Sequence, residues 1–287
     1  MALLLKGFPV AKAITQQLLP RVEQLAAKGI TPTLAILRVG EKEDDISYEK
    51  GALKRCSQVG IAVKQLHLPQ DAEQQTLLDA IGQLNRDDTV HGVLILRPLP
   101  SHLNDAAVCG ALSPQKDVDG ITPYSMAGIF TGSSVGYPPC TPQGCIEILE
   151  HYQIPISGKR AVVLGRSLVV GKPASMLLLQ KNATVTICHT RTQNLPAVCR
   201  EADILLAAAG QPQMVTEEFL RPGQILLDVG IHPLPDGSIC GDVCFAAAEP
   251  VVQAITPVPG GTGAVTTAVL AKHVVEAAEK FSEKKEK

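Results

Sequence analysis

Tryptophan is absent from this sequence, and aromatic residues make up only 3% of its 287 residues. The core must therefore be filled with aliphatic side chains, since hydrophobic residues still account for 45% of the chain. Long apolar runs are missing as well. None approaches the ~18 residues of a membrane-spanning helix, and Leu3–Leu5 is too short for a signal peptide. These absences predict a cytoplasmic protein without a membrane partner.

An excess of charge of one sign is also missing. The chain has 26 Lys and Arg residues and 28 Asp and Glu residues, which gives a formal net charge of −2. A nucleic-acid-binding domain normally carries a basic patch or stripe. Because the two signs are mixed along this chain, we expect no nucleic-acid partner.

The eight cysteines do not form a C-x-x-C pair. Their closest spacings are Cys140/Cys145 and Cys240/Cys244, which differ from the ligand spacing of structural zinc sites. Scattered cysteines in a cytoplasmic protein are usually small buried hydrophobic residues. We therefore expect no metal site and no disulfide framework.

Helical and strand patterns alternate in the first part of the chain. This β-α-β-α order is typical of a mostly parallel sheet with helices on both faces. Residues 132–142 are dense in Gly, Ser and Pro and are the best candidate for a domain boundary. The helices are expected over 10–28, 45–59 and 71–85, and the strands over 33–39, 62–68 and 90–96.

The second part has the size and pattern of a Rossmann-like unit. A final alanine- and valine-rich helix over 267–280 is expected to pack on the first domain. The fold class is therefore α/β with two domains, the first comprising 1–138 and 267–287 and the second, inserted domain 139–266. In the second domain a helix is expected near 143–151 and strands over 161–164, 184–188, 204–208, 225–229 and 254–256.

The segment 159–173, KRAVVLGRSLVVGKP, places a glycine turn between a valine-rich strand and a helix start. Free backbone N–H groups and the positive end of the helix dipole make such a turn a phosphate site. The spacing departs from G-x-G-x-x-G, because Ser167 replaces the middle glycine. Taken alone, the loop is equally typical of a turn that closes some other βα unit.

Six further motifs lie along the chain, although each taken singly is also typical of an ordinary turn. Together with the VVLGRS loop they cover nearly the whole sequence. In their order the chain resembles the methylenetetrahydrofolate dehydrogenase/cyclohydrolase family, whose bacterial members are usually bifunctional. The motifs are KDVDG (116–120), PCTP-x-G (139–144), CHTRT (188–192), DVGI (228–231), GDV (241–243) and TPVPGG-x-G (256–263).

The resemblance implies a cleft between the two domains that binds a reduced folate and a nicotinamide. A hydride leaves the one-carbon bridge of 5,10-methylenetetrahydrofolate, and water then opens the methenyl product to 10-formyltetrahydrofolate. Tyr48 is expected to stack on the folate and Asp119 to hydrogen-bond the pterin. The family also suggests a homodimer formed through the nucleotide domains. The remaining substrate contacts that the resemblance implies are Pro257, Pro259, Gly260 and Gly261.

NADP is the expected cofactor, with NAD as the alternative. A NAD enzyme of this fold places a carboxylate after the second strand, whereas this chain has Thr190 and Arg191 there. A guanidinium suits a 2′-phosphate through paired hydrogen bonds. The full set of cofactor contacts that the resemblance implies is Gly165, Arg166, Ser167, Gly171, Thr190, Arg191 and Ile231.

The chain departs from the family at the lysine four residues after the tyrosine, where it has Ala52. Lys50 and Lys54 lie roughly 160° away on a helix, so Arg55 is the one nearby cation that could lean toward the site. Arg97 also stands where the family has glutamine. We hypothesise that Arg97 supplies the missing positive charge and is catalytic together with Tyr48 and Asp119.

Asp45, where many relatives have serine, is the expected counter-ion of Arg97. Hydride transfer tolerates this exchange, but arginine does not lose a proton near neutral pH as a tuned lysine can. We therefore expect a dehydrogenase with a weakened cyclohydrolase. The alternatives are a monofunctional methylenetetrahydrofolate dehydrogenase, a non-catalytic folate- or nucleotide-binding regulator, and a dehydrogenase of amino or keto acids.

Overall fold

The computed structural model describes residues 1–285 of the chain, and its contacts divide them into two compact units. Met1–Lys12 and Thr141–Thr266 form one of these, which we call the six-stranded unit. Ala13–Cys140 and the chain from Thr267 onward form the other, the three-stranded unit. The last two residues of the predicted first domain, 286–287, lie outside the described part.

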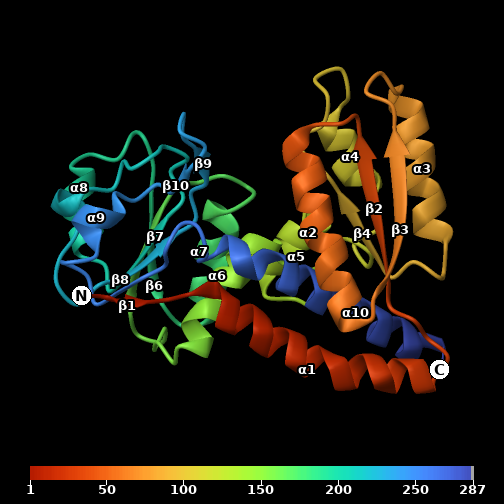
Figure 1. Ribbon diagram of the computed structural model, residues 1–287, viewed down its shortest axis with the longest axis horizontal. Helices are drawn as coiled ribbons and strands as arrows, with labels where there is room; N and C mark the ends of the chain where they lie inside the picture. Colours follow the sequence, from red (N-terminus) through yellow and green to blue (C-terminus); the bar gives the residue numbers. More distant parts are fainter. Residues whose placement is uncertain (286–287) are drawn as a thin grey trace. The chain divides into compact units, whose positions relative to one another are not determined.

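The six-stranded unit is built on a parallel sheet of order β1-β11-β8-β7-β5-β6 (Figure 1). The central strands are short runs of Val, Leu, Ile and Ala that are buried on both faces, as expected for a parallel sheet covered by helices. The strands are β1 (Leu3–Leu4), β5 (Arg160–Leu164), β6 (Thr184–Cys188), β7 (Ile204–Ala207), β8 (Ile225–Asp228) and β11 (Ala254–Ile255), and the helices are α7 (Gly171–Gln180), α8 (Leu195–Arg200) and α9 (Phe245–Ala248). A hairpin of β9 (His232–Pro233) and β10 (Ile239–Cys240) and the 3-10 turn η1 (Glu217–Phe219) complete it.

The three-stranded unit contains a parallel sheet of order β3-β2-β4. Ala35, Leu37 and Val39 of β2 join a buried cluster with Leu77 and Ile81 of α3, so α3 covers that face. Figure 1 shows α2 on the opposite side of the strands from α3. The strands are β2 (Thr33–Val39), β3 (Ala62–Leu68) and β4 (Gly92–Ile95), and the helices are α2 (Glu43–Val59), α3 (Gln74–Arg86), α4 (Asp105–Ala111) and α5 (Pro123–Thr131).

Three helices contain the points at which the chain passes from one unit to the other. They are α1 (Gly7–Ala27), α6 (Cys140–His151) and α10 (Gly263–Lys285).

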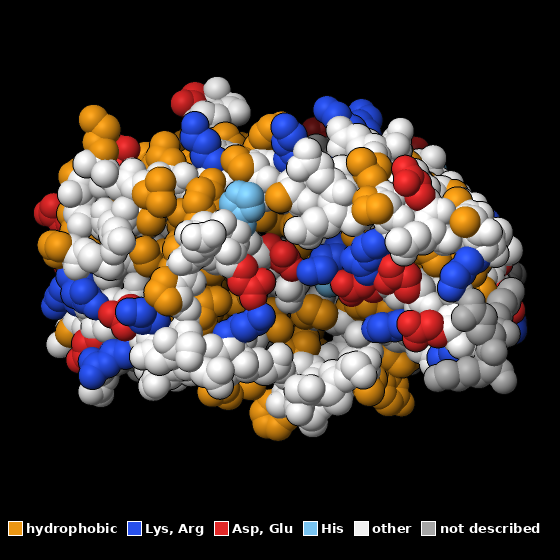
Figure 2. Space-filling view, turned by 90° about the horizontal axis from the view of Figure 1, so that it is seen from below, with side chains coloured by type: hydrophobic (Ala, Val, Ile, Leu, Met, Phe, Trp, Pro, Cys, Tyr) orange, Lys and Arg blue, Asp and Glu red, His pale blue; other side chains and the backbone are white. Residues whose placement is uncertain are grey.

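None of the helices within residues 1–285 combines the length and the apolar character needed to cross a bilayer. On the face shown in Figure 2, basic side chains lie among acidic ones, and neither sign forms a continuous field.

The periodic patterns located most elements well. The strands predicted over 33–39, 62–68 and 184–188 are confirmed at the same bounds, and the start of the helix at Gly171 is also confirmed. Six of the eight cysteines are buried and Cys240 and Cys244 are half-buried, all as free thiols. The sequence missed β1, the β9–β10 hairpin, η1 and the short helices α4, α5, α8 and α9, because elements of two to nine residues carry too few positions to show a clear period.

The amino terminus lies in a different unit from the one expected. The sequence grouped residues 1–138, whereas the structure groups Met1–Lys12 with the six-stranded unit. The reason is pairing: Leu3 and Leu4 extend the sheet beside Ala254 and Ile255. Such long-range pairing of a two-residue strand leaves no trace in the local sequence.

Candidate active site

The carboxyl ends of β2, β3 and β4 lie at one edge of the three-stranded sheet, since the strands are parallel. Ligands of open α/β sheets bind at such an edge. Arg97 follows β4 there, and Tyr48 lies on α2, the helix that leaves the end of β2. The structure thus places Tyr48 and Arg97, which are far apart in the sequence, in one unit.

Two carboxylates of the KDVDG turn have different surroundings. Asp117 is fully buried, and its oxygens accept hydrogen bonds from Ile121 N at 2.9 Å, Thr122 N at 2.8 Å and Ser125 Oγ at 2.5 Å. Asp119 is only half-buried. Asp117 therefore holds the turn together, and Asp119 is the carboxylate available to a ligand.

Asp119 lies in electrostatic contact with Tyr48 and Cys140. Burial raises the pKa of Asp119 to about 6, although a hydrogen bond from Cys140 opposes the shift. Burial raises the pKa of Tyr48 well above its usual value, and the negative charge of Asp119 adds to this effect. The site therefore combines a phenol that stays protonated with a carboxyl group that titrates near neutral pH.

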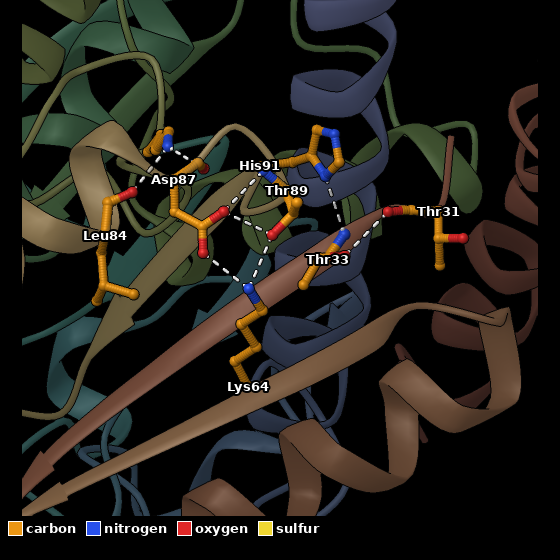
Figure 3. A network of polar contacts seen from close by, with 8 residues as sticks. Thr31, Thr33, Lys64, Leu84, Asp87, Thr89 and His91 are labelled. Carbon is orange, nitrogen blue, oxygen red and sulfur yellow. Dashed lines mark hydrogen bonds and ion pairs between the residues drawn. The ribbon is translucent and has the colours of Figure 1, made fainter. Parts of the chain in front are cut away.

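Lys116 of the same turn anchors it to the opposite, amino-terminal edge of the sheet. Its Nζ donates to the carbonyl oxygens of Leu84 and Asp87, each at 2.7 Å. The Asp87 side chain in turn binds Lys64 and Thr89 (Figure 3). Lys116 is therefore a structural residue of the motif.

The position that holds lysine in the family carries no charge here. Ala52 is fully buried on α2. Arg55 does not take the place of that lysine, because its Nη1 donates to Thr15 Oγ1 at 2.8 Å and to Gln58 Oε1 at 3.1 Å. Arg55, the one nearby cation that could have leaned toward the site, instead holds its guanidinium against Thr15 and Gln58.

Arg97 is paired with Asp105, the first residue of α4. Its Nε donates to Asp105 Oδ1 at 2.7 Å and its Nη2 to Asp105 Oδ2. This hydrogen bonding raises the pKa of Arg97, and the charge of Asp119 acts in the same direction. The prediction that Asp45 is the counter-ion of Arg97 is therefore wrong. The charged neighbours of Asp45 are Lys42, Asp44 and Arg38, and burial raises the pKa of Asp45.

In the six-stranded unit, the glycine turn after β5 is shaped by close backbone contacts. A Cβ on Gly165, whose φ is +131°, would lie 2.1 Å from Ala208 O, and one on Gly171 would lie 2.2 Å from Gly165 O. Only glycine fits these positions. Ser167 Oγ accepts hydrogen bonds from Val170 N and Gly171 N at 3.1 and 3.4 Å, so two amides at the start of α7 already have a partner.

Arg166 and Arg191 follow two neighbouring strands at the same edge of the sheet. Leu164 pairs with Cys188, so Arg166 and the turn that contains Thr190 and Arg191 follow adjacent strand ends. Arg166, Thr190 and Arg191 are all exposed. Within residues 1–285 neither guanidinium forms an ion pair, which leaves both free for an anionic group.

Ile231 and the TPVPGG-x-G segment also meet at the carboxyl edge of this sheet. Ile231 is 60% exposed, and its Cδ1 lies 3.4 Å from where a Cβ of Gly263 would be. Pro259 and Gly260 are exposed, Pro257 is half-buried and Gly261 is buried, with a Cβ position 2.5 Å from Pro257 O. The segment therefore presents backbone and proline rings at this edge.

Asp228 joins three of the sequence motifs. Its carboxylate accepts from Gly230 N, Asp242 N and Val243 N at 3.0, 2.9 and 3.1 Å, and its carbonyl accepts from Thr262 Oγ1 at 2.9 Å. Burial raises the pKa of Asp228 to about 6. It is a structural carboxylate that holds the DVGI, GDV and TPVPGG-x-G loops together.

The sequence analysis missed a polar cluster next to Tyr48, in which a buried ion pair is joined by two exposed side chains. Arg38 and Glu49 are 7% and 4% exposed and form an ion pair with Nε to Oε2 at 2.9 Å. Gln65 and His67 bind the other oxygen of Glu49. Two signals were available: an arginine within the apolar strand TLAILRV, and a glutamate on the buried stripe of a helix.

The fold and the glycine turn define a dinucleotide-binding α/β protein of two units. Comparison with family models is more specific. Residues 5–119 match the catalytic domain of tetrahydrofolate dehydrogenase/cyclohydrolase, and residues 139–282 match its NAD(P)-binding domain. The chain belongs to the tetrahydrofolate dehydrogenase/cyclohydrolase family.

The chain is similar to known proteins of this family over almost its full length. The chain is 53% identical to the "Bifunctional protein FolD" of Carboxydothermus hydrogenoformans, covering 97% of this chain and 98% of that one. The crystal structure of the bifunctional FolD of Campylobacter jejuni has a TM-score of 0.95 and 37% identity, covering 98% and 99% of the two chains. The Trypanosoma brucei enzyme, solved with NADP and an inhibitor, has a TM-score of 0.92 and 32% identity, with coverages of 97% and 98%.

Proposed function

We propose that this protein oxidises 5,10-methylenetetrahydrofolate with NADP and hydrolyses the methenyl product to 10-formyltetrahydrofolate. The observation that carries the proposal is Asp119, a half-buried carboxylate beside Tyr48 at the carboxyl edge of the three-stranded sheet. Membership of the family supplies the reaction.

The folate is proposed to bind Tyr48 and Asp119. An ionised Asp119 accepts hydrogen bonds from pterin N–H groups, and the protonated Tyr48 offers a flat ring for stacking. Pro257, Pro259 and the glycines Gly260 and Gly261 offer a flat, backbone-rich surface toward folate and nicotinamide.

NADP is proposed over NAD because of the two exposed arginines. The turn at Gly165 and Gly171 has the close-packed backbone that a dinucleotide pyrophosphate approaches, so the residues present fit this cofactor. Arg166 and Arg191 supply donors for a 2′-phosphate, and Ser167, Thr190 and Ile231 complete the proposed contacts. When bound, the nicotinamide accepts the hydride. The presence of NADP in the related Trypanosoma brucei enzyme supports this choice.

In the hydride step the protein has only to orient the reactants and stabilise charge, since no side chain takes up a proton. Tyr48 and Asp119 fix the folate ring. Arg97 is proposed as the catalytic cation, held in place by Asp105.

The hydrolysis step needs water to lose a proton as it adds to the methenyl carbon. Arg97 stays charged, because its pKa is raised, and so it cannot exchange that proton. Ala52 offers no replacement. We therefore propose that hydrolysis is slower than hydride transfer in this chain.

The test is a spectroscopic assay of methylenetetrahydrofolate oxidation with NADP and, separately, with NAD. We expect faster reduction of NADP and a transient build-up of the methenyl compound. Equal rates for the two cofactors would contradict the NADP assignment. Build-up that never decays would indicate a monofunctional dehydrogenase, and no reduction of either cofactor would overturn the proposed function.

The family resemblance also leads us to propose a homodimer and a cytoplasmic location. The structure is compatible with association through the six-stranded unit, in which β6 is an edge strand paired only with β5 among the described strands. Exposed edge strands are common association sites.

A further inference from the structure

The cluster around Glu49 lies directly beside the proposed folate site. The buried stripe of α2 consists of Asp45, Glu49, Ala52, Cys56 and Val59. Glu49 is one of two acidic residues in this stripe, and it follows Tyr48 immediately in the chain. Its position makes it the point at which the helix that carries Tyr48 is attached to the sheet.

Glu49 uses both carboxylate oxygens. Arg38 Nε donates to Oε2 at 2.9 Å, while Gln65 Nε2 and His67 Nε2 lie 2.7 and 2.8 Å from Oε1. Burial alone would raise the pKa of Glu49, but hydrogen bonds from Gln65, His67 and Arg38 lower it. Glu49 is therefore ionised and bound from three directions.

The three partners come from one face of two adjacent strands. Arg38 pairs in register with His67, and Ile36 pairs with Gln65. Side chains alternate along a strand, so Arg38, Gln65 and His67 all point toward α2, while Leu66 and Leu68 pack against the cluster on the α3 side. The sheet thus presents a fixed set of donors to one helical residue.

Two further bonds connect this cluster to the rest of the site. Arg38 Nη1 also donates to the carbonyl of Gly40, which begins the turn before α2. Lys42 Nζ, in the same turn, donates to Pro98 O at 2.7 Å, next to Arg97. The turn that starts α2 is therefore tied to both β2 and the segment after β4.

We propose that the clamp of Arg38, Glu49, Gln65 and His67 is a positioning device that sets the rotation of α2 and so aims Tyr48 at the folate. This inference rests on the proposed function, in which Tyr48 contacts folate. A buried ion pair adds little stability compared with apolar residues of similar volume, but its hydrogen bonds are directional. Rotating a helix by about 10° moves a ring ~8 Å from its axis by more than about 1 Å, enough to impair a reacting geometry.

The first experiment compares Glu49→Gln with Lys64→Met in the full-length enzyme. Lys64 is on the same strand as Gln65 but on the other face, where it pairs with Asp87 (Figure 3). We expect Glu49→Gln to raise KM for methylenetetrahydrofolate by about tenfold or more while KM for NADP changes by less than about twofold. Lys64→Met should leave both KM values unchanged.

The second variant separates positioning from stability. In Arg38→Leu/Glu49→Leu, apolar residues replace both charges, so the chain should keep its stability but lose the directional bonds. We expect its thermal stability to be retained and its KM for methylenetetrahydrofolate to stay raised. A folate KM equal to that of the wild type in this folded variant would overturn the clamp, whatever the fate of Glu49→Gln. Failure of the wild type to oxidise methylenetetrahydrofolate would instead overturn the proposed function.

Discussion

Asp117 and Asp119 stand two residues apart in one turn, yet their environments give them different roles. Asp117 is fully buried and accepts three hydrogen bonds from the protein, so a ligand cannot reach it. Asp119 is half-buried, with a pKa raised to about 6. At the residue scale, burial together with the protein donors already in place separates a structural carboxylate from a binding carboxylate.

The raised pKa of Asp119 predicts a pH-dependent affinity for folate. Only the ionised carboxylate accepts two pterin hydrogen bonds, so KM for methylenetetrahydrofolate should rise as the pH falls through about 6. The measurement is KM between pH 5 and pH 8. In Asp119→Asn the KM should be high and nearly independent of pH, and a profile identical to that of the wild type would contradict this role.

The same shift has a consequence for stability. Burial penalises the ionised Asp119 only in the folded state, so the penalty is full above pH 6 and absent below the ordinary aspartate pKa of about 4. Asp119→Asn should therefore raise the thermal midpoint at pH 8 but not at pH 4. An equal change at both values would indicate a cause other than ionisation.

A double variant at positions 52 and 97 tests the role assigned to Arg97. Restoring the family pair in Ala52→Lys/Arg97→Gln adds a base that can exchange a proton with water, so the cyclohydrolase rate should rise by about tenfold or more relative to hydride transfer. The ratio of the two rates, followed from the methenyl signal, is the measurement. The single variant Arg97→Gln is the control and should lower the hydride rate without raising hydrolysis. An unchanged ratio in the double variant would contradict the proposal.

Elements show where sequence patterns succeed and where they fail. The strand over 33–39 is a run of seven buried residues, and its pattern located it correctly. The same run contains Arg38, whose partner Glu49 lies on α2. Local periodicity identifies the strand but not the partner, because the pairing depends on how the helix packs on the sheet.

The packing of the chain at and just after β1 can be tested by mutation. Leu5 follows β1 and is fully buried, whereas Leu3 within it is 54% exposed. Leu5→Ala should lower the free energy of unfolding by roughly 2–5 kcal/mol through lost burial and a cavity. The matched variant Leu3→Ala should change it by less than about 0.5 kcal/mol in urea titration. Equal effects would mean that the amino terminus does not pack as the structure has it.

At the scale of the whole molecule, the six-stranded sheet ends in β6, whose residues Thr184 and Thr186 are exposed. Ile187 on this strand is 37% exposed. If the proposed homodimer forms through this edge, a charge at position 187 should convert the dimer to a monomer. Sedimentation of Ile187→Lys measures this. Ile239→Lys, at a residue of similar exposure on the β9–β10 hairpin, should remain dimeric. A monomeric wild type would contradict the homodimer itself.

The sequence by itself determined the class of fold, the order of most strands and helices, and the family. These depend on short-range features: periodicity, glycine turns and motif spacing, which are readable because each is set within a few residues. The tertiary structure decided which unit takes in residues 1–12, the partner of Arg97, and the contrast between Asp117 and Asp119. It also decided the clamp at Glu49. Each of these depends on contacts between distant segments, whose geometry only the packed chain defines.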